Sequence, residues 1–277
     1  MKKLVLLAGV IAAGLMGLNL TPARAYVIDG SVLDWGIDLS SANSKGYLDS
    51  HLPSGGLDTD TVTEDNADKY HKWTEVGPGW AYYNYFDAEA MYFDNDQSYA
   101  YIAIVQGLPI SGYKVNGYPR FYPGDIGLDL NHDGVYEYGL DVREYDAADK
   151  KAKLFNNLTA SNWQDVYYPA FSIANPWEIK SGSTFNWVDF VYSENQNSHY
   201  VLEAAIPLSY LGLSADPGAA ISPLTVHWTM QCGNDYLNLP ADVNPVPEPG
   251  SLVLLVTGLF GLAGFLAKTG LPAGRQV

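Results

Sequence analysis

AEAMYF (88–93), the polar turn DNDQ (94–97) and SYAYIAIV (98–105) carry the clearest β-hairpin pattern in this 277-residue chain. Side chains in each run alternate with period two, and Asp and Asn between the runs favour a turn. Two more pairs repeat the arrangement: DIGLDL (125–130) with VYEYGLDV (135–142), and TFNWVDFVY (184–192) with HYVLEAAIP (199–207). We therefore predict an all-β fold, an antiparallel β-sandwich (jelly-roll-like) with long loops.

The last expected strand is LTVHWTMQC (224–232). Its alternation places Val226, Trp228, Met230 and Cys232 on one face, which we expect to lie in the core. Cys232 could act as a nucleophile with His227 or His199, but on an apolar face it is expected to behave as a small hydrophobic residue. With a single cysteine the chain can form no intrachain disulfide.

The N-terminus is predicted to be a signal peptide covering residues 1–25. Two lysines precede the apolar run LVLLAGVIAAGLMGLNL (4–20), and Ala23-Arg24-Ala25 is a small-x-small cleavage site. An N-terminal membrane anchor is the alternative, although the run is short for a spanning helix. Export from the cytosol is expected.

The C-terminus has three parts. Val246-Pro247-Glu248-Pro249 ends a Pro-rich linker (241–250), the apolar run SLVLLVTGLFGLAGFLA (251–267) predicts a single transmembrane helix, and a short basic tail (268–277) follows. This order resembles the PEP-CTERM sorting signal of Gram-negative bacteria. The resemblance implies that an exosortase in the inner membrane cuts near the motif, so that a transiently anchored protein reaches the cell surface or extracellular matrix. The tail holds only Lys268 and Arg275, whereas the family usually ends in clustered arginines.

The region between the two ends, residues 26–240, is predicted to be one β-sandwich domain. VIDGSVLDWG (27–36), DAEAMYFDNDQSYAYIAIV (87–105), GDIGLDLNHDGVYEYGLDV (124–142) and LEAAIPLSYLG (202–212) resemble motifs of the family-9 carbohydrate-binding-module-like (DOMON-like) β-sandwich. The resemblance implies this architecture and, less directly, carbohydrate binding, because a fold does not fix a function.

The chain is acidic, with a formal net charge of −16. Residues 26–245 hold 10 basic and 30 acidic residues, which gives this part a net charge of −20. Such a charge argues against nucleic acid and anionic lipid as partners, because too few cations are present to neutralise phosphates. It fits a soluble surface protein and leaves divalent-cation binding open.

Asp129, Asn131 and Asp133, followed by Gly134, form the sharpest local constellation. Oxygen ligands at alternate positions before a glycine can converge on Ca²⁺, and Glu137 could add another oxygen. A twelfth-position glutamate is replaced by Leu140, which excludes an EF-hand. The alternative is a plain hairpin turn.

Four tryptophans lie in sequence contexts typical of loops: Trp73, Trp80, Trp163 and Trp177. Exposed indole rings can stack on the apolar faces of sugars, so these residues are candidates for carbohydrate binding. Alternatively, they cap the ends of the core. Trp187 and Trp228 lie within predicted strands and are expected in the core.

These observations favour a non-enzymatic, exported carbohydrate-binding or adhesion module of an exopolysaccharide or biofilm matrix. A polysaccharide-modifying enzyme is the first alternative. Asp87 and Glu89 alternate on one strand and could act as acid and base, with Glu203 as a more distant candidate. A purely structural matrix protein without a ligand is the second alternative.

Overall fold

A computed structural model describes residues 25–42, 46–54, 58–65, 74–76, 79–81, 83–194 and 199–246. The predicted signal peptide up to residue 24, the Pro247–Pro249 part of the sorting motif, the apolar run 251–267 and the tail 268–277 lie outside the described residues. None of the helices within the described ranges is long and apolar enough to cross a membrane.

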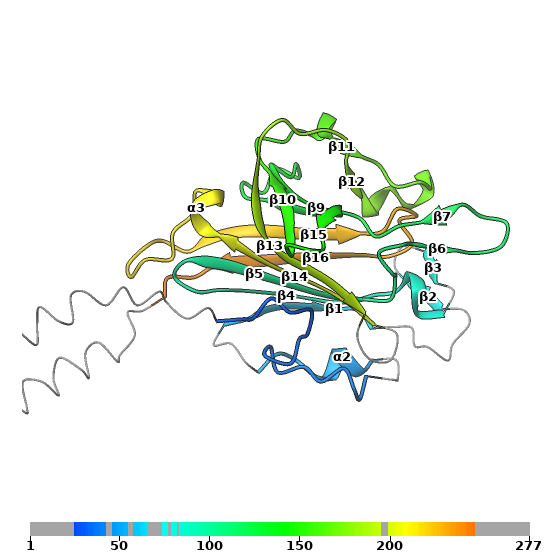
Figure 1. Cartoon of the computed structure of the whole chain (residues 1–277), viewed down its shortest axis with the longest axis horizontal. Helices are drawn as coiled ribbons and strands as arrows, with labels where there is room; N and C mark the ends of the chain where they lie inside the picture. The colour runs from blue at the N-terminus through cyan, green and yellow to red at the C-terminus, as the bar shows by residue number, and fades with distance from the viewer. Residues whose placement is uncertain are drawn as a thin grey trace, which may run out of the picture.

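Ten strands form one continuous sheet in which every neighbouring pair is antiparallel (Figure 1). In sheet order they are β1 (Asp60–Thr63), β4 (Ala88–Asn95), β5 (Tyr99–Gln106), β14 (Tyr200–Pro207), β13 (Phe185–Glu194), β10 (Lys151–Phe155), β9 (Tyr138–Asp146), β8 (Ile126–Asp129), β15 (Ser222–Thr229) and β16 (Tyr236–Val243). The predicted antiparallel β-rich fold is confirmed, as are its three hairpins, β4–β5, β8–β9 and β13–β14.

The remaining described elements are short. Two-stranded ladders join β2 (Thr74–Val76) to β3 (Gly79–Ala81), β6 (Tyr113–Lys114) to β7 (Arg120–Phe121), and β11 (Trp163–Gln164) to β12 (Glu178–Ile179). The helices are α2 (Tyr47–Ser50), α3 (Leu208–Leu211) and the 3-10 turns Tyr83–Phe86, Ala160–Asn162 and Pro169–Ala174. Within the described residues, these short elements lie around the large sheet and form no second sheet of comparable size.

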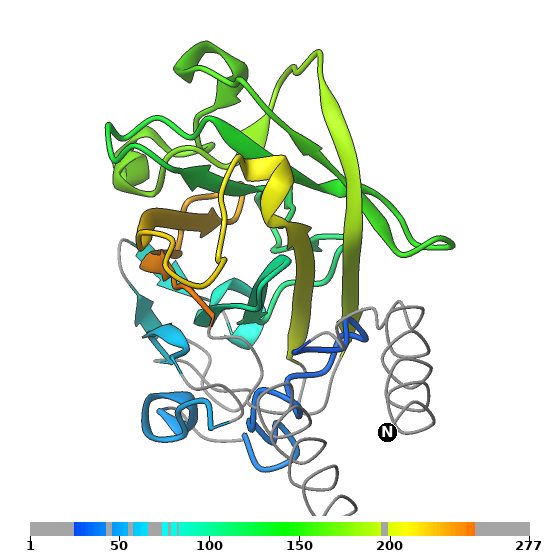
Figure 2. The ribbon, with the colours of Figure 1, turned by 90° about the vertical axis from the view of Figure 1, so that its left-hand side faces the viewer.

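The large sheet curls until it is nearly closed (Figure 2). Its two edge strands come together, and the Asp242 N–H donates to Asp60 Oδ2 at 2.8 Å. Beside them, Asn95 Nδ2 donates to the Asn244 carbonyl at 2.9 Å. The two separate packed sheets that a β-sandwich requires are not shown, because β14 pairs with both β5 and β13 and so joins the hairpins into one ladder.

Inside the curled sheet lies the main core. Trp228, Phe190 and Met230 are fully buried there, and the Trp228 indole N–H donates to the Gly124 carbonyl at 3.0 Å. Cys232 belongs to the same cluster, and burial raises the pKa of its thiol to about 12. The expected apolar face of the last strand is confirmed, and so is the core position of Trp228.

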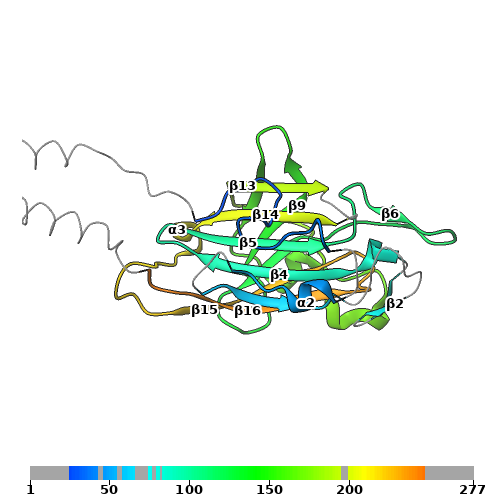
Figure 3. The ribbon, with the colours of Figure 1, turned by 90° about the horizontal axis from the view of Figure 1, so that it is seen from below.

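The N-terminal segment covers the outer face of β4, β5 and β14 (Figure 3). Trp35 stacks on Tyr26 with ring centroids 3.9 Å apart, and both pack against Tyr92 and Tyr101 of the sheet. These three strands are therefore buried on both faces, which explains why their sequences are apolar almost throughout.

Candidate functional site

Trp163 and Trp177 are not exposed, and the prediction that they offer sugar-stacking surfaces is corrected. Their exposed fractions are 5% and 3%, and the Trp163 indole N–H donates to the Tyr136 carbonyl at 3.0 Å. Residues 156–183 fold back over the sheet and bury their own aromatic rings in two small clusters. Trp73 lies outside the described residues, and Trp80 lies in β3, where no side chain is described.

Trp187 shows the opposite deviation. It was expected in the core, yet 47% of it is exposed, and its neighbour Phe185 is 43% exposed. Period two along β13 turns Val188 and Phe190 into the core and leaves Phe185 and Trp187 outside. The two exposed rings contact edge to face with centroids 5.6 Å apart. They form an exposed aromatic pair on the described outer surface.

The strand register places polar residues of the neighbouring strands beside this aromatic pair. Lys153 of β10 stands opposite Trp187 on one side and Asp141 of β9 on the other. In the adjacent row, Phe155 stands opposite Phe185. Residues directly opposite each other in a ladder share one face, so these side chains form one continuous surface, called here the β9–β10–β13 face.

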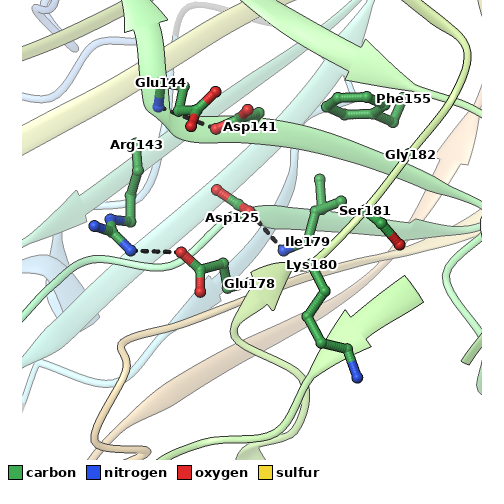
Figure 4. A pocket seen from close by; sticks show the side chains of 10 residues that line it. All are labelled: Asp125, Asp141, Arg143, Glu144, Phe155, Glu178, Ile179, Lys180, Ser181 and Gly182. Carbon is green, nitrogen blue, oxygen red and sulfur yellow. Dashed lines mark hydrogen bonds and ion pairs between the residues drawn. The ribbon is translucent and has the colours of Figure 1, made fainter. Parts of the chain in front are cut away.

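A pocket of about 490 Å³ opens at the β9 end of this face (Figure 4). Four carboxylates and two cations dominate its lining, which consists of Asp125, Asp141, Arg143, Glu144, Phe155, Glu178, Ile179, Lys180, Ser181 and Gly182. Phe155 links the pocket to the exposed pair, because its ring lies 5.5 Å from that of Phe185. The pocket thus has polar walls and an aromatic margin.

Asp125 lies at the buried end of the pocket. Its Oδ1 accepts the Val142 N–H and its Oδ2 accepts the Ile179 N–H, both at 2.8 Å, so it fastens β12 to the sheet. Burial raises the pKa of Asp125 to about 8, and the charge of Asp141 adds to the shift. Asp125 is therefore predominantly protonated at neutral pH.

Asp141 is the second buried carboxylate of the pocket, with 9% of its surface exposed. Its Oδ1 accepts the Glu144 N–H at 3.0 Å, and its Oδ2 has no hydrogen-bond partner among the residues that the structure describes. Burial also raises the pKa of Asp141, opposed by the charges of Lys153 and Arg143. Both cations are already paired, Lys153 with Glu144 at 3.0 Å and Arg143 with Glu178 at 2.5 Å.

The predicted calcium loop is a separate constellation. Asp129, Asp133 and Glu137 each place a carboxylate oxygen within 4.8 Å of the others, a spacing that one Ca²⁺ could span. The Asn131 amide instead supports the turn: its Nδ2 donates to Glu137 Oε1 at 2.6 Å and its Oδ1 accepts the Asp133 N–H at 2.9 Å. Asp129 accepts N–H groups from Asn131, His132 and Gly134. The all-oxygen donor set fits a hard cation, and the same bonds also stabilise a bare turn.

The carboxylates considered for catalysis do not meet in an open site. Asp87, Glu89 and Glu203 are all fully buried. A bulge between Ala88 and Ala90 interrupts the alternation on which the pairing of Asp87 with Glu89 rested, and Glu89 lies 2.9 Å from His199 Nε2. Glu203 accepts hydrogen bonds from the N-terminal segment.

Comparisons of the chain with known protein families, curated proteins and solved structures give no match. The candidate site is defined by its own geometry: an exposed aromatic pair on β13, a row of ion-paired side chains on β10 and β9, and the acidic pocket beside them.

Proposed function

We propose that this protein is an exported, exosortase-processed surface or matrix protein that binds carbohydrate through the β9–β10–β13 face and is not an enzyme. The observation that carries the proposal is the exposed pair Phe185 and Trp187 beside a polar pocket. The resemblance to the family-9 carbohydrate-binding-module-like β-sandwich supports the same function. The sandwich itself remains part of this proposal.

The chemistry of sugars suits this face. A pyranose ring has an apolar C–H surface that packs on an indole, and hydroxyl groups at its edge that need hydrogen-bond partners. Trp187 offers the ring surface, while Glu144 and Glu178 offer carboxylate acceptors within the neighbouring pocket. A ligand longer than one sugar could contact the aromatic pair and the pocket together.

The two ends of the chain support the proposed location outside the cytosol. A basic, apolar and small-x-small N-terminus favours export, and the Val246–Pro249 motif followed by an apolar run favours exosortase processing at the inner membrane. The net charge of −20 over residues 26–245 favours partners other than nucleic acid.

Binding of the purified protein to a polysaccharide array tests the proposal. Trp187→Ala should weaken binding about tenfold, since loss of one stacked ring costs roughly 1–1.5 kcal/mol. Tyr118→Ala is the control, because Tyr118 is also exposed, at 54%, but lies between β6 and β7, which are not part of the large sheet. Unchanged affinity in Trp187→Ala would remove this face from carbohydrate binding.

The same array separates the alternatives. A purely structural matrix protein should bind none of the polysaccharides. A polysaccharide-modifying enzyme should release reducing sugar, and that release should disappear in Glu89→Gln. Its absence across many substrates would leave the enzyme alternative without support.

A further inference from the structure

We propose that the ligand of the β9–β10–β13 face is a cationic polysaccharide, one that carries free amino groups on its sugars. This inference rests on the proposed carbohydrate-binding function and specifies its substrate class. It follows from the distribution of charge in the pocket beside the aromatic pair.

The cations nearest to Asp141 are already neutralised. Lys153 pairs with Glu144 and Arg143 pairs with Glu178, so neither is available to balance a further carboxylate in full. Lys180 also lines the pocket, but its side chain extends away from Asp125 and Asp141 (Figure 4). Because Asp125 is predominantly protonated, Asp141 is the one carboxylate of the pocket that could carry charge without an ion-pair partner within the described residues.

Asp141 is also incompletely satisfied. It is nine-tenths buried, and only its Oδ1 has a hydrogen-bond partner within the described part of the chain. Asp141 lines the pocket, so a ligand that brings a positively charged N–H group can donate a charge-assisted hydrogen bond to its unpaired oxygen. A sugar hydroxyl would supply a donor without the charge, and an anionic sugar would be repelled.

The distance from the pocket to the aromatic pair fits a polymer. Asp141, Lys153 and Trp187 occupy one row across three adjacent strands, and strands lie about 4.8 Å apart. Asp141 and Trp187 are thus separated by roughly 10 Å, about the length of a disaccharide. One sugar can stack on Trp187 while the amino group of a nearby sugar enters the pocket.

Titration calorimetry with three uncharged or cationic hexamers tests the inference: a glucosamine hexamer, its fully N-acetylated counterpart and cellohexaose. The full chain is used in mild detergent because of its apolar ends. At a pH where the amines are protonated, the glucosamine hexamer should bind about tenfold or more tightly than the other two. Raising the NaCl concentration should weaken the binding of the glucosamine hexamer and leave the affinities for the other two unchanged.

Asp141→Asn should remove most of this preference. The amide can keep accepting the Glu144 N–H through its oxygen, so the change is small in shape. Asp149→Asn is the control, because Asp149 is exposed in the turn at the far end of the same hairpin. Retained cellohexaose binding and an unchanged melting temperature would show that Asp141→Asn is folded.

The outcomes separate this inference from the proposed function. Equal affinity for all three hexamers, or an unaltered preference in Asp141→Asn, would overturn the cationic ligand while leaving carbohydrate binding intact. Binding that is insensitive to Trp187→Ala, or absent for every hexamer and for the array, would overturn the proposed function itself.

Discussion

Replacement of Glu203 should detach the N-terminal segment from the sheet. Glu203 Oε2 accepts the N–H groups of Asp29, Gly30 and Ser31 at 3.1, 2.7 and 3.2 Å, and its Oε1 accepts the Trp35 indole N–H at 3.0 Å. One side chain on β14 therefore satisfies four donors from residues 29–35. Through Trp35, it also holds the aromatic cluster that covers the outer face of β4 and β5.

The magnitude follows from the two donors that are buried, Gly30 N–H and Trp35 Nε1–H. Each buried donor left without an acceptor costs roughly 1–3 kcal/mol, so Glu203→Ala should lower the free energy of unfolding by about 3–5 kcal/mol. Glu203→Gln keeps one acceptor oxygen but turns an amide toward a donor, and should cost about 1–3 kcal/mol. Glu194→Ala, an exposed position at the end of β13, should change stability by less than about 0.5 kcal/mol.

Urea denaturation followed by tryptophan fluorescence measures the loss, and hydrogen exchange locates it. Exchange should accelerate first in residues 26–42, because these residues depend directly on Glu203. A loss below about 1 kcal/mol in Glu203→Ala, or unchanged exchange in this segment, would refute the account of Glu203 as the anchor of the N-terminal cover.

Three further predictions concern pH, calcium and processing. Burial raises the pKa of Asp125 from 3.8 to about 8, so the folded state holds this proton more tightly than the unfolded chain. The urea concentration at the unfolding midpoint should therefore fall as pH rises from about 4 to about 8. Asp125→Asn should make this dependence of the midpoint on pH less steep. If the Asp129 loop binds Ca²⁺, about 1 mM CaCl₂ should raise the melting temperature and Asp133→Ala should abolish the rise, whereas a melting temperature indifferent to calcium and chelator would count against the site. Mass spectrometry of the protein from its native host should find a chain that starts at Tyr26 and lacks residues 251–267, and an intact tail on an intracellular protein would contradict the proposed processing.

The local parts of the fold could be predicted from the sequence, and the closure of the sheet could not. Each hairpin is encoded by period-two alternation around a short polar turn, as in residues 88–105. By contrast, β5 pairs with β14 across about a hundred residues of sequence, and β1 meets β16 at a still larger separation. No local pattern distinguishes these pairings from those of two stacked sheets.

The site was mispredicted for a related reason. Loop context suggested that Trp163 and Trp177 were exposed, but a loop that folds back on the sheet buries its aromatic residues. The alternation that separates Phe185 and Trp187 from Val188 and Phe190 is present in the sequence, yet it cannot say which side faces out when both sides carry aromatic rings. Asp125 meets Ile179, and Arg143 meets Glu178, only because β12 docks against the large sheet, which is a tertiary contact.

Two segments cover parts of the outer face of the large sheet and leave the part at β13 open. Residues 26–42 and Leu48 cover the outer face of β4, β5 and β14, and Glu203 secures that cover with buried hydrogen bonds. Residues 156–183 cover another part of the outer face, at β9 and β10, with Trp163 and Ile179 packed near Phe155, and end before β13. The rim of this second cover is where the pocket forms, and the strand beyond it keeps Phe185 and Trp187 exposed. The proposed ligand would cover the apolar surface of these two rings and contact the polar pocket beside them at the same time.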